Sequence, residues 1–282
     1  MSVLPTSDYR ERRPAPQLRG YLVCLWAQAI GEGGVDYPQR VLPDGCIDIL
    51  WTGESSPVII GPMTRMCIAR LAPRSLLIGA RLRPGTAMSV LGLPACAILN
   101  QEVPLEVAWR RPDELTARLA GQPSPEKRLA IVEEALLARM VEAKAGDLLV
   151  QAGVAWLAAR PDGRVRDLCR DAGVSERQLR RRFRAAVGYG PKTLDRILRL
   201  QRALALNAAP EARLGLAALA ADAGYADQAH MSREFSELSG ASPAALLPFA
   251  HSALALADLF KTEVREAAWV ASADAAKACS FA

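Results

Sequence analysis

The chain has 282 residues, of which 51% are hydrophobic, and it carries a formal net charge of +5. That length and apolar content suit two folded domains with separate cores. The first residues show no basic segment followed by an apolar run, and no stretch approaches 18 uncharged apolar residues. We therefore expect a cytoplasmic protein that is neither exported nor inserted into a membrane.

The supply of cysteine and histidine argues against a zinc site, because such sites need several of these ligands at close spacing. Only His230 and His251 provide imidazoles, and the cysteines form no Cys-x-x-Cys pair. A glycine-rich phosphate loop and a Gly-x-Ser-x-Gly nucleophile motif are also missing. We expect no metal, no cofactor and no catalytic residues. The six cysteines, expected to be mostly reduced and buried, are Cys24, Cys46, Cys67, Cys96, Cys169 and Cys279.

Short apolar or alternating runs, separated by Gly, Pro, Asp and Ser, occupy the N-terminal third of the chain. This texture is typical of strands in a small sheet or barrel. A tight turn at Pro43-Asp44-Gly45 is expected to lead into the second of these strands. The predicted strands are Tyr21–Ala27, Cys46–Trp51, Pro57–Ile60, Met66–Leu71 and Ser75–Leu82.

Polar and aromatic side chains on or beside these strands are candidates for binding a small polar molecule. They are Asp44, Asp48, Trp51, Arg81 and Arg83. The alternative is structural: Asp44 makes the turn, Asp48 pairs with one of the two arginines, and Trp51 fills the core. Cys46 also has two possible roles: it is either a redox or electrophile sensor, or a buried and inert thiol.

Two helical patterns follow, at Pro112–Leu119 and Pro125–Met140, and each begins with Pro and acidic residues, which are signals for a helix start. The second pattern has an apolar stripe, which is expected to pack either on the N-terminal sheet or on a second subunit. The stripe consists of Leu129, Val132, Leu136, Leu137 and Met140.

A doubled motif dominates the C-terminal half. Asp171-Ala-Gly-Val-Ser175, with Phe183, Gly188 and Pro191 after it, is echoed by Asp222-Ala-Gly-Tyr225, with Phe235, Gly240 and Pro243 after it. The offset is 51 residues at the glycines of the turns and 52 at the phenylalanines, so the second turn has gained one residue. Each copy is predicted to be a helix, a tight turn and a second helix.

The second helix of the first copy, Glu176–Ala186, separates two faces. Leu179, Phe183 and Ala186 lie at i, i+4 and i+7 and predict the buried stripe, while five arginines occupy the rest of the surface. Guanidinium groups match the acceptors of guanine and of phosphate. The five arginines, which we predict to contact DNA rather than only solvent, are Arg177, Arg180, Arg181, Arg182 and Arg184.

These residues resemble the AraC/XylS-type transcriptional regulators. The resemblance covers roughly residues 150–248. In the first copy the matching motifs are Asp171-Ala-Gly-Val-Ser-Glu-Arg-Gln-Leu-Arg-Arg-Arg-Phe183 and Gly188-Tyr-Gly-Pro191. In the second copy they are Ala223-Gly-Tyr-Ala-Asp-Gln-Ala-His-Met-Ser-Arg-Glu-Phe235 and Gly240-Ala-Ser-Pro243. It implies two helix-turn-helix units joined by a long helix at Pro191–Asn207, with both recognition helices entering successive major-groove segments about 10 base pairs apart.

Carried over by position, base contacts of the first unit fall on Arg177, Arg180 and Arg181, and Lys192 adds a cation to the predicted interface. Those of the second unit fall on Gln228, His230, Ser232 and Arg233, although exposed polar residues such as Gln228 need no function. Residues 164–202 contain twelve basic and four acidic residues, whereas residues 203–249 contain two and five. Since phosphate contacts supply much of the affinity for DNA, we expect the first unit to anchor the complex.

The N-terminal part resembles a domain found ahead of AraC-type units in a group of bacterial regulators, whose ligand is generally not known. The matching motifs are Arg40-Val-Leu-Pro-Asp-Gly-Cys-Ile-Asp-Ile-Leu-Trp51, Gly61-Pro62 and Gly79-Ala-Arg-Leu-Arg-Pro-Gly85, within roughly residues 9–109. By analogy with sugar-responsive members of the AraC type, this domain is expected to bind a small-molecule effector, but an analogy of fold is a weak warrant.

The sequence thus predicts a two-domain α+β protein. Residues 1–110 form a β-rich small barrel or sheet, 111–148 a helical connector with a role in dimerisation, 149–249 an all-α tandem helix-turn-helix domain, and 250–282 an Ala-rich helical tail. The expected function is bacterial transcription regulation, with double-stranded DNA, an effector, a second subunit and, for an activator, RNA polymerase as partners. Two alternatives remain open: a cysteine-based DNA-alkyl acceptor and an effector-independent architectural DNA binder.

Overall fold

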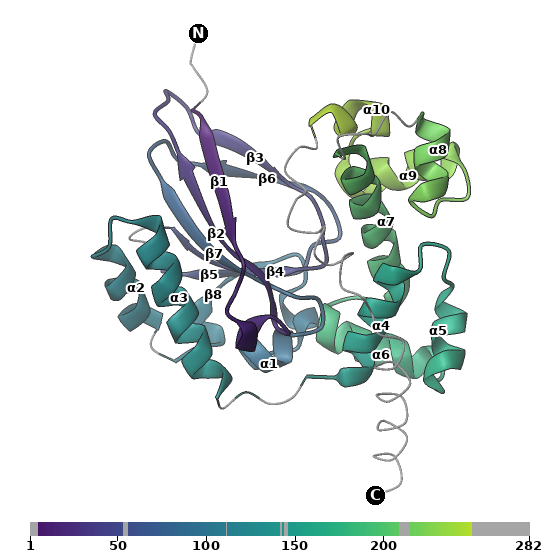
Figure 1. The fold of residues 1–282 in the computed structure, drawn as a ribbon, viewed down its shortest axis with the longest axis horizontal. Helices are drawn as coiled ribbons and strands as arrows, with labels where there is room; N and C mark the ends of the chain where they lie inside the picture. Colours follow the sequence, from purple (N-terminus) through teal and green to yellow (C-terminus); the bar gives the residue numbers. More distant parts are fainter. Residues whose placement is uncertain are drawn as a thin grey trace, which may run out of the picture.

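The N-terminal half is built on a six-stranded antiparallel sheet (Figure 1) with the strand order β1-β2-β7-β4-β5-β8. The computed structural model describes residues 5–52, 56–110, 112–141, 143, 146–208 and 215–249. The six strands are β1 (Ser7–Arg12), β2 (Leu22–Ile30), β4 (Ile47–Thr52), β5 (Val58–Ile60), β7 (Leu76–Leu82) and β8 (Glu102–Pro104). Because β1 and β8 lie at opposite edges, these strands form an open sheet rather than a closed barrel.

A two-stranded ribbon of β3 (Tyr37–Val41) and β6 (Cys67–Leu71) covers one face of the sheet. A small apolar cluster lies between the two layers and includes Cys24, Trp26 and Cys46. All five strands predicted from the sequence are present, as β2, β4, β5, β6 and β7. The sequence did not predict β1, β3 and β8, because β1 is largely exposed, β3 contains a proline, and β8 has only three residues.

The opposite face of the sheet is covered by α2 (Pro112–Ala120) and α3 (Pro125–Met140), together with the short helices α1 (Ala87–Leu91), η1 (Pro16–Leu18), η2 (Ala95–Ile98) and η3 (Leu105–Val107). Both predicted connector helices are therefore present. Ser124 caps α3 by accepting a hydrogen bond from the Lys127 amide. Leu129, Val132 and Leu136 of the predicted stripe are buried in the core of this domain. The stripe thus packs within the chain.

The C-terminal half is helical, and its long helix α7 (Pro191–Ala208) runs between two groups of helices (Figure 1). One group comprises α4 (Leu148–Ala159), α5 (Val165–Ala172) and α6 (Glu176–Val187), and the other comprises α8 (Leu216–Asp222), α9 (Gln228–Ser239), α10 (Pro243–Leu246) and η4 (Leu247–Phe249). One continuous apolar core joins both groups. The predicted tail helix at 250–282 lies outside the described residues.

None of the helices in the described ranges combines the length and the apolar content that crossing a lipid bilayer requires.

Candidate nucleic-acid interface

The first helix-turn-helix unit consists of α5 and α6, and three residues join the two helices. Gly173 ends α5 in the left-handed conformation, with φ of 64°, which glycine adopts without steric cost. Ser175 and Gln178 then form a reciprocal capping box at the start of α6. The chain therefore reverses sharply and begins α6 with a fixed direction, as the sequence predicted.

Four arginines make one exposed stripe on α6. Arg177, Arg180, Arg181 and Arg184 lie at i, i+3, i+4 and i+7, which places them along one side of a helix, and all four are exposed. Leu179 and Phe183 on the other side are fully buried. No ion pair of these four guanidinium groups occurs within the described residues. The stripe is thus a row of uncompensated positive charge on a short helix.

Arg182 lies apart from this arginine stripe. Its guanidinium makes two hydrogen bonds of 2.7 Å with the carboxylate of Asp147, the N-cap of α4. This bidentate pair fastens α6 to α4 and leaves Arg182 only partly exposed. Lys192 is exposed in the first turn of α7. Of the two, Lys192 is the better placed for an external anion.

The second unit consists of α8 and α9, which five residues connect. Gly224 has φ of 89°, and Asp227 caps α9 by accepting a hydrogen bond from the His230 amide. The connection is longer than in the first unit, as the change of offset in the sequence predicted. Phe235 is fully buried in α9, where Phe183 is buried in α6. The two units therefore share a scaffold.

The four polar residues predicted to read bases on α9 differ in their surroundings. Gln228 and Arg233 are exposed. The His230 ring accepts a hydrogen bond from the Ala226 amide through Nδ1, its Nε2 lies 3.4 Å from the Glu234 carboxylate, and the ring packs edge-on against Tyr225. The Ser232 hydroxyl donates to the carbonyl oxygen of Gln228. His230 and Ser232 thus already have partners within the chain.

Superposing the repeat at an offset of 52 residues shows how the two exposed faces differ. The arginine stripe of α6 corresponds to Ala229, Ser232, Arg233 and Ser236 on α9. Only Arg233, the counterpart of Arg181, keeps a positive charge. The other three corresponding positions on α9 carry small, neutral side chains.

The net charge counted over residues 164–202 overstates what the first unit presents to a partner. Arg196 and Arg199 of α7 pair with the buried carboxylate of Glu234 in the second unit. Arg202 donates to the carbonyl oxygens of Ala158 and Ala223. These three arginines fasten α7 to the second unit and to α4, so the contrast in external charge rests mainly on the arginine stripe.

The candidate ligand residues of the N-terminal domain meet in a compact cluster. Arg81 makes hydrogen bonds of 3.1 to 3.3 Å with Asp48 and lies 3.8 Å from Asp44. Asp44 accepts a hydrogen bond from the Cys46 amide, as a turn-forming aspartate does. Burial raises the pKa of Asp44 above its ordinary value, and the nearby Arg81 opposes this shift. Mutual pairing therefore satisfies these three side chains.

Trp51 and Arg83 also have structural surroundings. Trp51 is 2% exposed and packs near Trp109 in the core. The Nε of Arg83 donates to the carbonyl oxygens of Arg19 and Leu22. The five residues thus fit the structural alternative, with Arg81 rather than Arg83 as the partner of Asp48.

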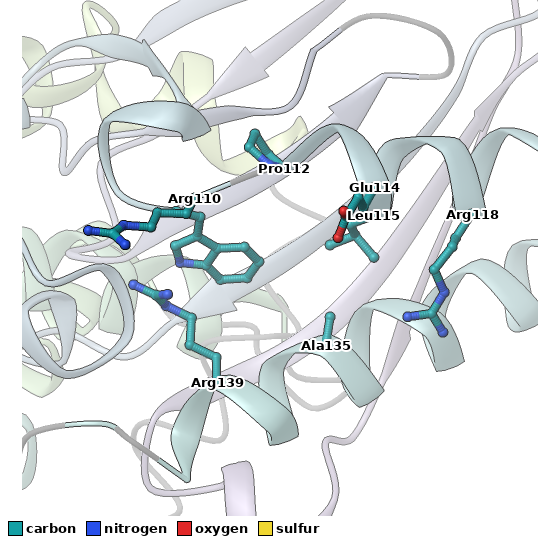
Figure 2. A pocket seen from close by; sticks show the side chains of 8 residues that line it. Arg110, Pro112, Glu114, Leu115, Arg118, Ala135 and Arg139 are labelled. Carbon is teal, nitrogen blue, oxygen red and sulfur yellow. The ribbon is translucent and has the colours of Figure 1, made fainter.

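An open depression of about 250 Å³ lies elsewhere on this domain, between α2, α3 and the segment after η3 (Figure 2). In Figure 2, Arg110 and Arg139 lie at one end of the depression and Arg118 at the other. None of the five candidate ligand residues lines it. Its lining residues are Trp109, Arg110, Pro112, Glu114, Leu115, Arg118, Ala135 and Arg139.

Sequence reasoning missed two contact residues, Asp147 and Gln201. Asp147 lies outside the repeat, and its pairing with Arg182 joins residues 35 positions apart. Gln201 is 3% exposed and donates from Nε2 to the carbonyl oxygen of Pro43 across the domain boundary, at 2.7 Å. No local pattern marks either residue, because each contact depends on the tertiary fold.

Comparison with known proteins agrees with this organisation. A family described as a helix-turn-helix domain matches residues 168–247, and a family described only as a domain of unknown function matches residues 10–104. No curated protein matches the chain.

Solved structures with a similar fold include ToxT from Vibrio cholerae O395, at 10% identity and a TM-score of 0.41, covering 81% of this chain and 96% of that one. Another is unsaturated fatty acid-bound wild-type ToxT from Vibrio cholerae strain SCE256, at 11% identity and a TM-score of 0.40, covering 86% and 94%. The tandem repeat, its capped helices and the matching helix-turn-helix family together show a DNA-binding transcription regulator whose C-terminal part is an AraC-type helix-turn-helix domain, preceded by a β-rich domain of unknown function.

Proposed function

We propose that this regulator recognises a specific double-stranded operator with α6 as its anchoring element. The single observation that carries the proposal is the stripe of Arg177, Arg180, Arg181 and Arg184, exposed on one side of a capped helix. An α-helix fits the major groove of B-DNA, and arginine pairs bidentately with guanine or binds phosphate. Arg182 is excluded from the proposed contacts because it pairs with Asp147.

In this proposal the second unit helps to distinguish the operator from other sequences, whereas the first unit supplies most of the affinity for DNA. Gln228 and Arg233 are the exposed candidates on α9 for contacts with base edges. An isolated cation and a neutral amide add few phosphate contacts, so they change sequence preference more than salt-dependent affinity. His230 contributes by fixing the start of α9 through its contacts with Ala226 and Glu234.

The test begins with selecting preferred sites from a pool of random duplexes and titrating the full chain onto the selected site at several salt concentrations. Arg177→Ala and Arg181→Ala should each weaken binding by about 10- to 100-fold and relax the preference at one base position. Arg13→Ala, an exposed arginine of the N-terminal domain, is the matched control. If both stripe variants bind with unchanged affinity, α6 is not the recognition helix. If the selection enriches no sequence, the protein is an architectural DNA binder rather than a sequence-specific regulator.

We further propose that the N-terminal domain receives the regulatory signal, in the form of a small effector. The depression beside Trp109 supports this proposal, because an indole that carries the Arg139 guanidinium on its face and has Arg110 at the same end of the depression suits a small aromatic carboxylate. Titrating benzoate-type acids while following tryptophan fluorescence tests the idea, with Arg110→Ala as the variant that should lose the response. Homodimer formation and contact with RNA polymerase stay predictions, and sedimentation measurements address the first of them.

A further inference from the structure

One loop of the N-terminal domain touches the first helix-turn-helix unit at the end of α6. The loop spans residues 61–66, between β5 and β6. Gly188, which ends α6 with φ of 101°, is buried against it: a Cβ at Gly188 would lie 2.6 Å from Cγ of Pro62. Such a separation excludes any side chain at Gly188, so the loop and the helix end are in direct contact.

The same loop touches the second unit at its other end. The Met66 amide donates a hydrogen bond of 2.8 Å to the carbonyl oxygen of Leu238 in α9. Cε of Met66 also lies 3.5 Å from where a Cβ at Gly240 would be. Gly240 ends α9 with φ of 68°. The loop is therefore in contact with the ends of both recognition helices.

The two contact points are equivalent positions of the repeat. Gly188 and Gly240 are 52 residues apart, the offset that also relates Phe183 to Phe235, and both are left-handed residues that end a recognition helix. Four positions of a single loop separate Pro62 from Met66. A chain of that length spans at most about 14 Å, so the loop limits how far apart these two helix ends lie.

The loop is held rigidly on its own domain by Asn100. Oδ1 of Asn100 accepts hydrogen bonds from the amide and the hydroxyl of Thr64, at 2.8 and 3.2 Å, and the Asn100 amide donates to the carbonyl oxygen of Pro62 at 3.0 Å. Asn100 has φ of 55°, a left-handed conformation that asparagine tolerates better than most residues. The loop is thus fixed between the two helix ends.

A second contact holds the long helix that joins the units. The turn Pro43-Asp44-Gly45 rests on α7, where Gln201 donates to the carbonyl oxygen of Pro43 in a buried environment. Gly45, with φ of 85°, approaches so closely that a Cβ would lie 3.0 Å from Cδ1 of Leu194. Both recognition helices and the helix between them are therefore in contact with the N-terminal domain.

We propose that the loop at 61–66 is a spacer that sets the separation of the two recognition helices, and thereby the distance between half-sites that the protein accepts. The inference rests on the proposed function, since it requires both units to contact DNA. Pro62 and Met66 make the contacts, and Asn100 is a positioning residue that acts through them.

The decisive variants are Asn100→Gly, which keeps the left-handed backbone but removes the acceptor for Thr64, and Asn100→Asp, which restores that acceptor. Labels at exposed Ala185 of α6 and Ala244 of α10 report the separation of the units by electron double resonance in the full chain without DNA. Ketone-bearing residues should carry the labels, because Cys67 and Cys96 are exposed. A second measurement compares binding to duplexes whose half-sites differ in spacing by two base pairs, and to a duplex with the first half-site alone.

The wild type and Asn100→Asp should give one narrow distance distribution and prefer one spacing by about tenfold, the effect of one lost base contact. Asn100→Gly should broaden the distribution and lose that preference while binding the single half-site as well as the wild type does. An unchanged distribution in Asn100→Gly, or an unchanged spacing preference, overturns the spacer. If the wild type gives a narrow distribution of label distances but binds no DNA sequence specifically, the proposed function is wrong, whereas the role of the loop in setting the separation of the two units stands.

Discussion

Arg182 and Glu234 occupy the same position in the two copies of the repeat, and each fastens its recognition helix to a neighbouring helix through an ion pair. Arg182 binds Asp147 at the start of α4, and Glu234 binds Arg196 and Arg199 of α7. The charge is reversed between the copies, but the role of the position is the same. A basic residue in α6 is therefore not always part of the outward-facing surface.

Replacing Glu234 should destabilise the second unit. Glu234→Gln removes one of the two carboxylates that pair with Arg199, whose side chain is only 14% exposed and which keeps its pair with Asp195. Losing a charge-assisted hydrogen bond at such a buried site costs about 1 to 3 kcal/mol of unfolding free energy. Glu237→Gln is the matched control, because that carboxylate is 64% exposed in its pair with Arg196 and should contribute less than about 1 kcal/mol. Urea denaturation measures both variants, and equal losses would contradict a special role for Glu234.

Lys192 should contribute to the salt dependence of DNA binding rather than to base preference. Its exposed position in the first turn of α7, beside α6, suits a phosphate contact. Lys192→Gln should lower the slope of log affinity against log salt by about 0.9. Lys127→Gln, an exposed lysine of α3, should leave the slope unchanged. If both variants keep the wild-type slope, Lys192 does not contact the backbone of the duplex.

The pKa of Asp44 predicts a dependence of stability on pH. Because burial raises this pKa in the folded state, the folded chain holds the proton more tightly than the unfolded chain. The contribution of Asp44 to stability is therefore complete below its ordinary pKa of 3.8 and is lost as the pH rises through the raised value. Asp44→Asn should thus gain stability relative to the wild type between acid and neutral pH. Denaturation at a series of pH values decides the matter.

The cysteines should fall into two classes of reactivity. Burial raises the pKa of the Cys24 and Cys46 thiols, whereas Cys67 and Cys96 are exposed. An alkylating reagent at neutral pH should therefore modify Cys67 and Cys96 in the native protein, and Cys24 and Cys46 only after unfolding. Peptide mass spectrometry reads out the order. Rapid modification of Cys46 in the native state would instead revive its role as an electrophile sensor.

The sequence predicted those elements whose side chains repeat with a clear period. The arginine stripe of α6, the capped turns and five strands follow from local patterns, because each depends on residues close together in the chain. Helix α4 was not predicted as a separate element, since Leu148–Ala159 is apolar on nearly every side and lacks an amphipathic period. The contacts of Gln201 and Met66 across the domain boundary could not be predicted from the sequence either, because only the tertiary fold brings these residues to their partners.

The asymmetry between the two units is tested most directly by measuring the affinity of the wild type, Arg181→Ala and Arg233→Ala for one selected operator under the same salt conditions. These arginines hold equivalent positions on α6 and α9, so the comparison changes one guanidinium at a time in the same structural setting. The arginine stripe predicts a clearly larger loss of affinity for Arg181→Ala than for Arg233→Ala. Equal losses, or a larger loss for Arg233→Ala, would contradict the first unit as the anchor.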